Sequence, residues 1–260
     1  MTSPDEFSRF KRQIKDKTGL DLESYKSQQL ERRILAMVKQ ADQPSLGHFY
    51  RHLESSPANM RLFLDKLTIN VSDFFRNPER WDHLAKEILP SLARQRQRLK
   101  LWSAGCSIGA ESYSLAMLLA EMNRLATSQI MATDIDDAAM TQARKGAFTE
   151  YDLKTLDPDR LRRHFVKQPD GSHVISDQMR KAVTFRVVDL LKDRYEGGVD
   201  LILCRNVVIY FTEEAKAEIY RRFYHSLNDG GILFVGGTER IVAHREAGWT
   251  MISPFFYQKT

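Results

Sequence analysis

The chain has 260 residues, of which 42% are hydrophobic and 28% charged, the proportions of an ordinary globular protein. That length allows one large domain and a small one. The sequence contains no apolar run long enough to span a membrane, and its start lacks the apolar core of a signal peptide, so we expect a cytoplasmic protein. The net charge of +5 indicates an acidic partner, which is either nucleic acid or an acidic protein surface.

Cysteine and histidine usage points away from disulfides and metals. Cys106 and Cys204 both lie in apolar segments and are expected to be buried free thiols. The seven histidines show no spacing with cysteine or carboxylate that is typical of ligands, so we predict no metal site.

Residues 1–75 are predicted to form an all-helical domain. Apolar residues recur at helical spacing, as in Phe7, Phe10 and Ile14, and Thr18-Gly19 ends the first helix. The second helix carries four cations toward its polar side: Lys26, Arg32, Arg33 and Lys39. These form either a solvated face or a docking face for an acidic partner.

The segment 67–78 places the polar residues Asn70, Ser72 and Arg76 among apolar ones. It reads either as a segment lying over a pocket or as a helix-capping turn before Pro78, and composition alone favours the turn. A linker helix is predicted within residues 76–98.

Residues 99–113 are the stretch around which the rest is organised. Leu99–Trp102 is a short apolar run fit for a buried strand, and small residues follow it, including Gly105 and Gly109. An apolar helical pattern comes next. Strand, small-residue turn and helix form the first unit of a nucleotide-binding fold, in which backbone N–H groups approach the ligand. The alternative is an ordinary tight turn between strand and helix.

An acidic residue completes this pattern. Gln129–Asp134 is predicted to be the next strand, and Asp134 follows Gly109 by 25 positions. In dinucleotide folds, an acid about 20 positions after the glycines binds the ribose hydroxyls. The alternative role of Asp134 is a helix N-cap, but Asp136 suits that role better because it directly precedes the helical residues.

The remainder of the domain 99–260 alternates strands with helices, which predicts an α/β, doubly wound, mainly parallel sheet with a late antiparallel hairpin. A short inserted β-hairpin is expected near 163–185, and Gly230-Gly231 is expected to end the last helix. Asp189 and Arg205-Asn206 follow predicted strands, as Gly105 and Asp134 do. Ligands in such folds lie at these carboxyl ends.

Four stretches, in this order, resemble the CheR-type chemoreceptor glutamate methyltransferases, and the resemblance covers nearly the whole chain. They are Thr68-Ile-Asn-Val-Ser-Asp-Phe-Phe-Arg76, Trp102-Ser-Ala-Gly-Cys-Ser107, Ala132-Thr-Asp-Ile-Asp136 and Cys204-Arg-Asn-Val-Val-Ile-Tyr-Phe211. The resemblance implies a seven-stranded Rossmann-like methyltransferase sheet. It also implies S-adenosylmethionine as cofactor, with S-adenosylhomocysteine as product. The implied substrate is a glutamate on the cytoplasmic helical bundle of a chemoreceptor.

The resemblance also implies roles for individual residues, and it overturns the capping-turn interpretation of segment 67–78. Asn70, Ser72 and Arg76 would reach the cofactor, Glu111 would lie near its methionine end, and Asp134 would hold the ribose. Asp189-Leu190 would flank the adenine. Arg205, Asn206 and Tyr210 would line the methyl-transfer site, with Arg76, Arg205 and Tyr210 as catalytic residues. The alternatives are a structural ion pair for Arg205 and a core aromatic for Tyr210.

One stretch departs from the family pattern: Gly109-Ala-Glu-Ser-Tyr113 stands where Gly-Glu-Glu-Pro-Tyr is usual. This leaves open a cofactor-binding docking module without activity. A nucleic-acid methyltransferase is disfavoured because no base-flipping motif such as Asn-Pro-Pro-Tyr is found. A nicotinamide dehydrogenase is disfavoured because the Gly-x-Gly-x-x-Gly spacing is missing. We expect a monomer that does not insert into membranes or bind nucleic acid.

Overall fold

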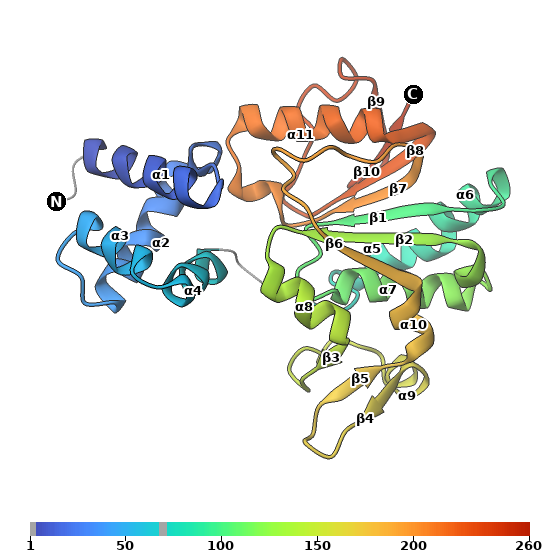
Figure 1. Cartoon of the computed structure of the whole chain (residues 1–260). Coiled ribbons are helices and arrows are strands. Elements are labelled where there is room, and N and C mark those ends of the chain that lie inside the picture. The colour runs from blue at the N-terminus through green and yellow to red at the C-terminus, as the bar shows by residue number, and fades with distance from the viewer. Residues whose placement is uncertain (1–3, 68–71) are drawn as a thin grey trace. The chain divides into compact units, whose positions relative to one another are not determined.

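A computed structural model of the chain describes residues 4–67 and 72–260 and divides them into two compact units (Figure 1). The first unit contains the N-terminal helices together with Val208–Glu218, and the second contains the rest of the described chain. Within the described residues, no helix is both long and apolar enough to cross a membrane.

The first unit is helical, as expected from the apolar spacing. Its helices are α1 (Pro4–Thr18), the 3₁₀ turn η1 (Leu22–Ser24), α2 (Ser27–Gln40), α3 (Leu46–Glu54) and α4 (Pro57–Leu67). Ser45 caps α3, because its hydroxyl accepts a hydrogen bond from the His48 N–H. Phe10 lies at the centre of the core, with the rings of Phe49 and Phe63 at centroid distances of 6.1 and 5.9 Å.

A segment from late in the chain belongs to this first unit. It comprises η4 (Val208–Tyr210) and the start of α11 (Glu213–Ser226). Two backbone hydrogen bonds hold it, from Lys26 N to Tyr210 O at 2.8 Å and from Thr212 N to Ser24 O at 2.9 Å. The sequence did not predict this attachment, because backbone pairing between distant segments leaves no local signal.

The second unit is built on a seven-stranded sheet with strand order β6-β2-β1-β7-β8-β10-β9. The strands are β1 (Lys100–Ala104), β2 (Gln129–Asp134), β6 (Val183–Val187), β7 (Val199–Cys204), β8 (Leu227–Val235), β9 (Trp249–Ser253) and β10 (Phe256–Lys259). The strands from β6 to β8 pair in parallel, and β10 pairs antiparallel with β8 and β9. This confirms the doubly wound sheet with a late antiparallel hairpin.

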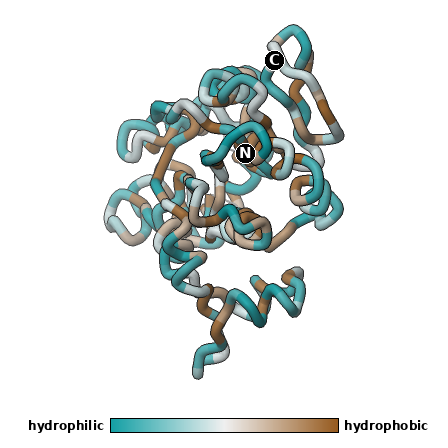
Figure 2. Tube along the Cα trace, turned by 90° about the vertical axis from the view of Figure 1, so that its right-hand side faces the viewer, coloured by the Kyte–Doolittle hydropathy of each residue, from teal (hydrophilic) through white to brown (hydrophobic). Residues whose placement is uncertain are grey.

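Helices cover both faces of this sheet (Figure 1). On one face lies α7 (Ala110–Glu121), which is buried almost all round, beside α8 (Asp137–Lys145). The chain enters this face through a continuous helix made of α5 (Pro78–His83), the π-helical turn η2 (Leu84–Ile88) and α6 (Leu89–Gln95). On the other face, Phe223 of α11 packs against Trp102 with ring centroids 5.3 Å apart. Hydrophilic and hydrophobic residues alternate along the chain, as expected of elements with one buried and one solvated face (Figure 2).

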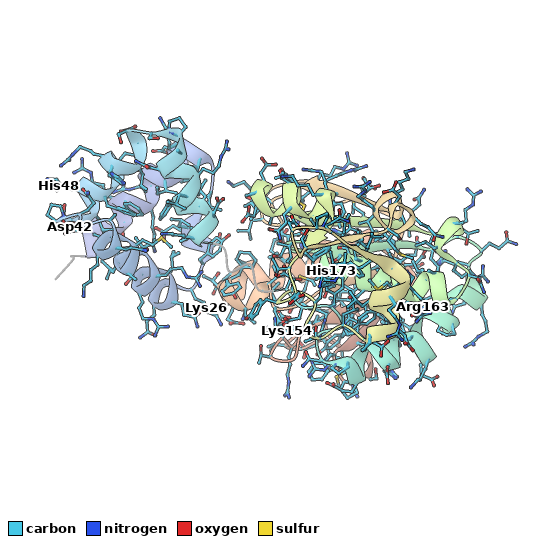
Figure 3. All side chains as sticks on the ribbon, turned by 90° about the horizontal axis from the view of Figure 1, so that it is seen from below. Lys26, Asp42, His48, Lys154, Arg163 and His173 are labelled. Carbon is cyan, nitrogen blue, oxygen red and sulfur yellow. The ribbon has the colours of Figure 1, made fainter. Side chains whose placement is uncertain are left out.

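The predicted hairpin is confirmed as part of a three-stranded antiparallel sheet of order β3-β5-β4. Its strands are β3 (Ala147–Phe148), β4 (Phe165–Lys167) and β5 (His173–Ile175), flanked by α9 (Pro158–His164) and α10 (Asp177–Ala182). Arg163 of α9 and His173 of β5 are labelled in this part of the second unit (Figure 3). Strand β3 has only two residues, which is too short to show alternation in the sequence.

One boundary differs from the expectation. Helix α11 ends at Ser226, and Gly230-Gly231 lie inside β8 instead of ending the helix. The pairing of β7 with β8 shifts register between Val199 and Leu201, so β8 is irregular between Leu227 and Ile232. Gly230 takes a positive φ of 75°, which explains the glycine there, because bulges and kinks in strands favour residues without a side chain.

Candidate active site

The turn after β1 is a close-packed structure that requires glycine at position 105. Gly105 has a φ of 76°, and a Cβ atom there would lie 2.3 Å from a methyl carbon of Val207. Gly109 caps α7 with a φ of 88° and offers no side-chain acceptor to the helix. The N–H groups of the first turn of α7 are therefore not satisfied by a cap, which is the arrangement that binds anionic groups in nucleotide folds.

Asp134, at the end of β2, holds this turn in place. One carboxylate oxygen accepts from Ser107 N at 2.7 Å, and the other accepts from Asp136 N at 3.1 Å. Burial raises the pKa of the Asp134 carboxyl, and these backbone N–H groups oppose the shift. Asp136 is the N-cap of α8, as predicted, because it accepts from Ala139 N at 2.9 Å. A carboxylate oxygen has two acceptor positions, so Asp134 retains capacity for ligand hydroxyls.

Glu111 and Arg205 form a buried ion pair at the carboxyl ends of β1 and β7. A guanidinium nitrogen of Arg205 lies 3.3 Å from one oxygen of Glu111, and the Ser103 hydroxyl donates to the other at 2.9 Å. The Arg205 side chain is only 2% exposed. Burial raises the pKa of Glu111, while the Arg205 guanidinium and the Ser103 hydroxyl favour its charged form. The structural ion pair considered for Arg205 is thus present.

The same guanidinium fixes the segment that carries Arg76. Its second terminal nitrogen donates to the Arg76 carbonyl at 2.7 Å and to the Asn77 side chain at 3.1 Å. Phe75 N donates to the Ser114 hydroxyl of α7 at 3.1 Å. Arg205 therefore positions the Arg76 backbone next to the first turns of α7.

The loop after β6 continues this edge of the sheet. Val188 N donates to the Asp134 carbonyl at 2.9 Å. The loop therefore lies beside Asp134, the residue predicted to bind the ribose. The Asp189 carboxylate accepts from Leu191 N at 2.8 Å and lies 3.6 Å from the Lys192 ammonium. Leu190 is buried, and its carbonyl accepts from the Tyr195 hydroxyl at 2.6 Å.

Backbone strain gathers in these segments. Among the described residues, eight non-glycine residues have a positive φ, and four of them lie in the segments just described: Phe75, Asn77, Ser107 and Asn206. Such conformations cost free energy and persist where the surroundings hold them, which is common at functional sites.

The structure brings together most of the predicted site residues. Gly105, Glu111, Asp134, Asp189, Leu190 and Arg205 lie at the carboxyl ends of β1, β2, β6 and β7, with Arg76 tied in by Arg205. Asn206 follows Arg205, and its N–H donates to the Glu239 carboxylate at 2.8 Å. Ser72 is half-buried, and Asn70 lies outside the described residues. Tyr210 belongs to η4 in the first unit.

Three supporting side chains were not predicted: Ser103, Ser114 and Glu239. The two serines left no signal, because a hydroxyl on a strand or helix reads as ordinary. Glu239 did leave one, since it is an acid that follows a strand and two glycines, as Asp134 follows a strand.

A surface groove of about 540 Å³ lies elsewhere in the second unit, lined by residues such as Lys100, Gln129 and Thr184. These residues lie at the amino ends of β1, β2 and β6. Because ligands of doubly wound folds bind at the carboxyl ends, this groove is not the candidate site. No group of three metal-ligating side chains occurs in residues 4–67 or 72–260.

Two family descriptions match the chain. The CheR methyltransferase SAM-binding domain matches residues 70–254, and the CheR methyltransferase all-alpha domain matches residues 5–68. The chain belongs to the CheR methyltransferase family. Its cofactor is therefore S-adenosylmethionine, as the resemblance implied.

Several curated relatives are similar over nearly their full length. The chemotaxis protein methyltransferase of Listeria monocytogenes is 41% identical, covering 96% of this chain and 96% of the relative. Chemotaxis protein methyltransferase 1 of Pseudomonas aeruginosa is 33% identical, covering 91% and 90%. The chemotaxis protein methyltransferase of Escherichia coli is 32% identical, covering 94% and 87%.

The groups at this CheR-family site fit that cofactor. Asp134 has acceptor positions for ribose hydroxyls, and the uncapped first turn of α7 can receive a carboxylate. Gly105 and Gly109 adopt the positive φ values that the turn requires, and Val207, Ala143 and Phe185 fill the space beside them, so the turn is held in one conformation.

Gly105→Ala tests the turn. The added Cβ would meet Val207 and would force a residue with a side chain into a left-handed conformation. We expect the Kd for S-adenosylhomocysteine, measured by calorimetry, to rise about tenfold or more. Gly197→Ala is the matched control, because a Cβ there meets nothing within 4 Å. Unchanged affinity in Gly105→Ala would show that the turn does not set the cofactor site.

Proposed function

We propose that this chain transfers the methyl group of S-adenosylmethionine to glutamate side-chain carboxylates of methyl-accepting chemotaxis receptors, forming glutamyl methyl esters. The observation that carries the proposal is one juxtaposition. Buried Arg205 ties the segment of Arg76 to Glu111 in the first turn of α7. This helix follows the turn from Gly105 to Gly109, which we call the cofactor turn. The family and the names of the relatives support the same reaction.

S-adenosylmethionine, when bound, supplies an electrophilic methyl group on a sulfonium. The chain need not supply a general base, because a glutamate with a pKa of about 4.3 is already ionised at neutral pH. Its residues have to align the carboxylate and exclude water. Alignment can contribute roughly 7–11 kcal/mol, and a dry site favours a reaction in which opposite charges disappear.

We assign these tasks to three predicted residues. Arg76 orients the incoming carboxylate, and its half-buried side chain has no hydrogen bond to another described residue. Arg205 acts through the Arg76 backbone and Glu111, since its guanidinium is engaged by protein groups. Tyr210 donates a hydrogen bond near the carboxylate or the sulfur. If both arginines bound the substrate carboxylate directly, they would stabilise the bound substrate more than the transition state and would slow methyl transfer.

Asn70, Ser72, Asn206 and the Asp189-Leu190 pair stay in the proposal as cofactor contacts. Asp134 is proposed as the ribose ligand, and its half-buried carboxylate at the end of β2 is suited to that role.

Helix α2 is proposed as the docking face for the receptor's helical bundle. Arg32, Leu35 and Lys39 are exposed at helical spacing along one side of α2. Arg33 is left out of the docking face, because its guanidinium donates a hydrogen bond to the Leu67 carbonyl. Lys26 (labelled in Figure 3) lies 4.0 Å from Glu213. A stripe of cations with an apolar centre suits an acidic, helical surface.

A docking module without activity is the second candidate, favoured by Ala110 and Ser112, which replace the usual glutamate and proline. Both residues are fully buried in α7. Glu111, which lies between them, keeps its ion pair with Arg205. The enzyme is therefore the better supported candidate.

The direct test is methylation of receptor fragments with labelled S-adenosylmethionine. We expect base-labile methyl esters on glutamate, and we expect Asp134→Ala to raise the Kd for S-adenosylhomocysteine roughly tenfold to a hundredfold, because ionic hydrogen bonds are lost. Asp137→Ala, at an exposed position of α8, is the control. Cofactor binding without methyl transfer would favour the docking module.

Arg76→Ala and Tyr210→Phe are expected to lower kcat about a hundredfold while changing the Kd for S-adenosylhomocysteine by less than about threefold. The reason is that both residues are assigned to the transferring groups. Initial rates at saturating cofactor and calorimetry measure the two quantities. Arg94→Ala, at an exposed position of α6, is the control. Equal losses in kcat and in affinity for S-adenosylhomocysteine would show that Arg76 and Tyr210 bind the cofactor instead of the substrate.

The double charge reversal Arg32→Glu with Lys39→Glu is expected to raise the KM for the receptor about tenfold, to leave kcat unchanged and to weaken the salt dependence of KM. The expectation follows from electrostatic steering by exposed cations. Steady-state rates between low and high salt measure it. Arg51→Glu, an exposed cation on α3, is the matched control, and an equal effect there would contradict docking through α2.

A further inference from the structure

Glu239 is a buried carboxylate that the reaction, as described so far, does not use. It lies in the loop after β8 and is only 3% exposed. One of its oxygens accepts from Gly236 N at 2.6 Å and from Asn206 N at 2.8 Å, and the other accepts from Val207 N at 2.9 Å. An ionised carboxylate is acceptor-only, so the group is matched to a nest of three donors.

Two of these donors belong to the turn that directly follows Arg205. This turn is strained, because Asn206 has a φ of 61°. A buried N–H group without an acceptor is costly, so the conformation of the turn depends on the carboxylate that holds it.

Two glycines allow close packing on either side of this turn. A Cβ on Gly236 would lie 2.3 Å from a Glu239 oxygen and 2.8 Å from Asn206 N. A Cβ on Gly105 would lie 2.3 Å from Val207. Glu239 thus holds the backbone of Val207, and the side chain of Val207 in turn packs against Gly105 of the cofactor turn.

We propose that Glu239 is a positioning residue that fixes the turn of Arg205, Asn206 and Val207 against the cofactor turn at Gly105. The proposal rests on the proposed function, in which this turn lines the methyl-transfer site. Glu239 acts through its backbone partners.

Glu239→Gln is the decisive variant, because it preserves shape and replaces one acceptor oxygen by an amide that cannot accept. We expect the Kd for S-adenosylhomocysteine to rise about tenfold or more at a binding stoichiometry near one. We also expect kcat for receptor methylation to fall, with the receptor KM within about twofold of the wild type. A purely structural role would lower the stoichiometry and leave the Kd of the folded fraction unchanged. That result would overturn the proposal.

Asp200→Asn is the matched control. Asp200 is 2% exposed, accepts from Lys100 N at 2.9 Å and from the Asn228 side chain at 2.7 Å, and lies at the opposite end of β7. We expect a lower Tm and an unchanged Kd for S-adenosylhomocysteine. An equal rise in Kd for Asp200→Asn and Glu239→Gln would show a general loss of packing and would overturn the proposal.

Gly236→Ala keeps the test open if Glu239→Gln fails to fold. It displaces the carboxylate without changing charge, so we expect the Kd to rise in the same direction, and an unchanged Kd would contradict the proposal. The double variant should lose less than the product of the single losses, because both changes act on one nest. Wild-type binding and methylation test the proposed function separately, since all effects here are measured relative to the wild type.

Discussion

The buried Arg205 guanidinium is the group on which the rest of the site depends. It pairs with Glu111 of α7, donates to the backbone of Arg76, bonds the side chain of Asn77 and lies 4.5 Å from the ring centre of Phe234. Burying such a pair gains little net stability, because both ions lose their hydration. Its value here is geometric, since a planar group with several fixed donors holds three chain segments in one arrangement.

Carboxylates perform the complementary task at the ends of the strands. Asp134 and Glu239 each accept backbone N–H groups from a turn, and Glu111 accepts from Arg205 and Ser103. The turns gain defined shapes, and the site gains negative charge although the chain as a whole carries +5. Negative charge is favourable for a sulfonium and an ammonium but unfavourable for an incoming carboxylate. A cation such as Arg76 is therefore needed where the substrate enters, while Arg205 is already neutralised by Glu111.

Local signals explain what the sequence predicted. The bounds of β2 and the N-cap of α8 were predicted as observed, because an apolar run and a capping aspartate are signals that lie in the element or directly beside it. The partners of Arg205 could not be predicted, since they come from segments far apart in the chain. The attachment of Val208–Glu218 to the first unit was missed for the same reason. The acid after β8 carried a usable signal, because Asp134 had already been found by the same rule.

The stretch Cys204–Phe211 is one motif in the sequence but two structures in the fold. Arg205 to Val207 belong to the second unit, where Glu239 holds the backbone of Asn206 and Val207. Val208 to Phe211 belong to the first unit, where residues 24–26 pair with the segment. A chain that leaves a sheet at a strained turn has no neighbouring strand to satisfy its N–H groups. A side chain must then supply the acceptors, and a buried carboxylate can serve three donors at once. The requirement for defined geometry at Arg205 thus accounts for a charge at position 239, where an apolar residue would pack but could not hold the turn.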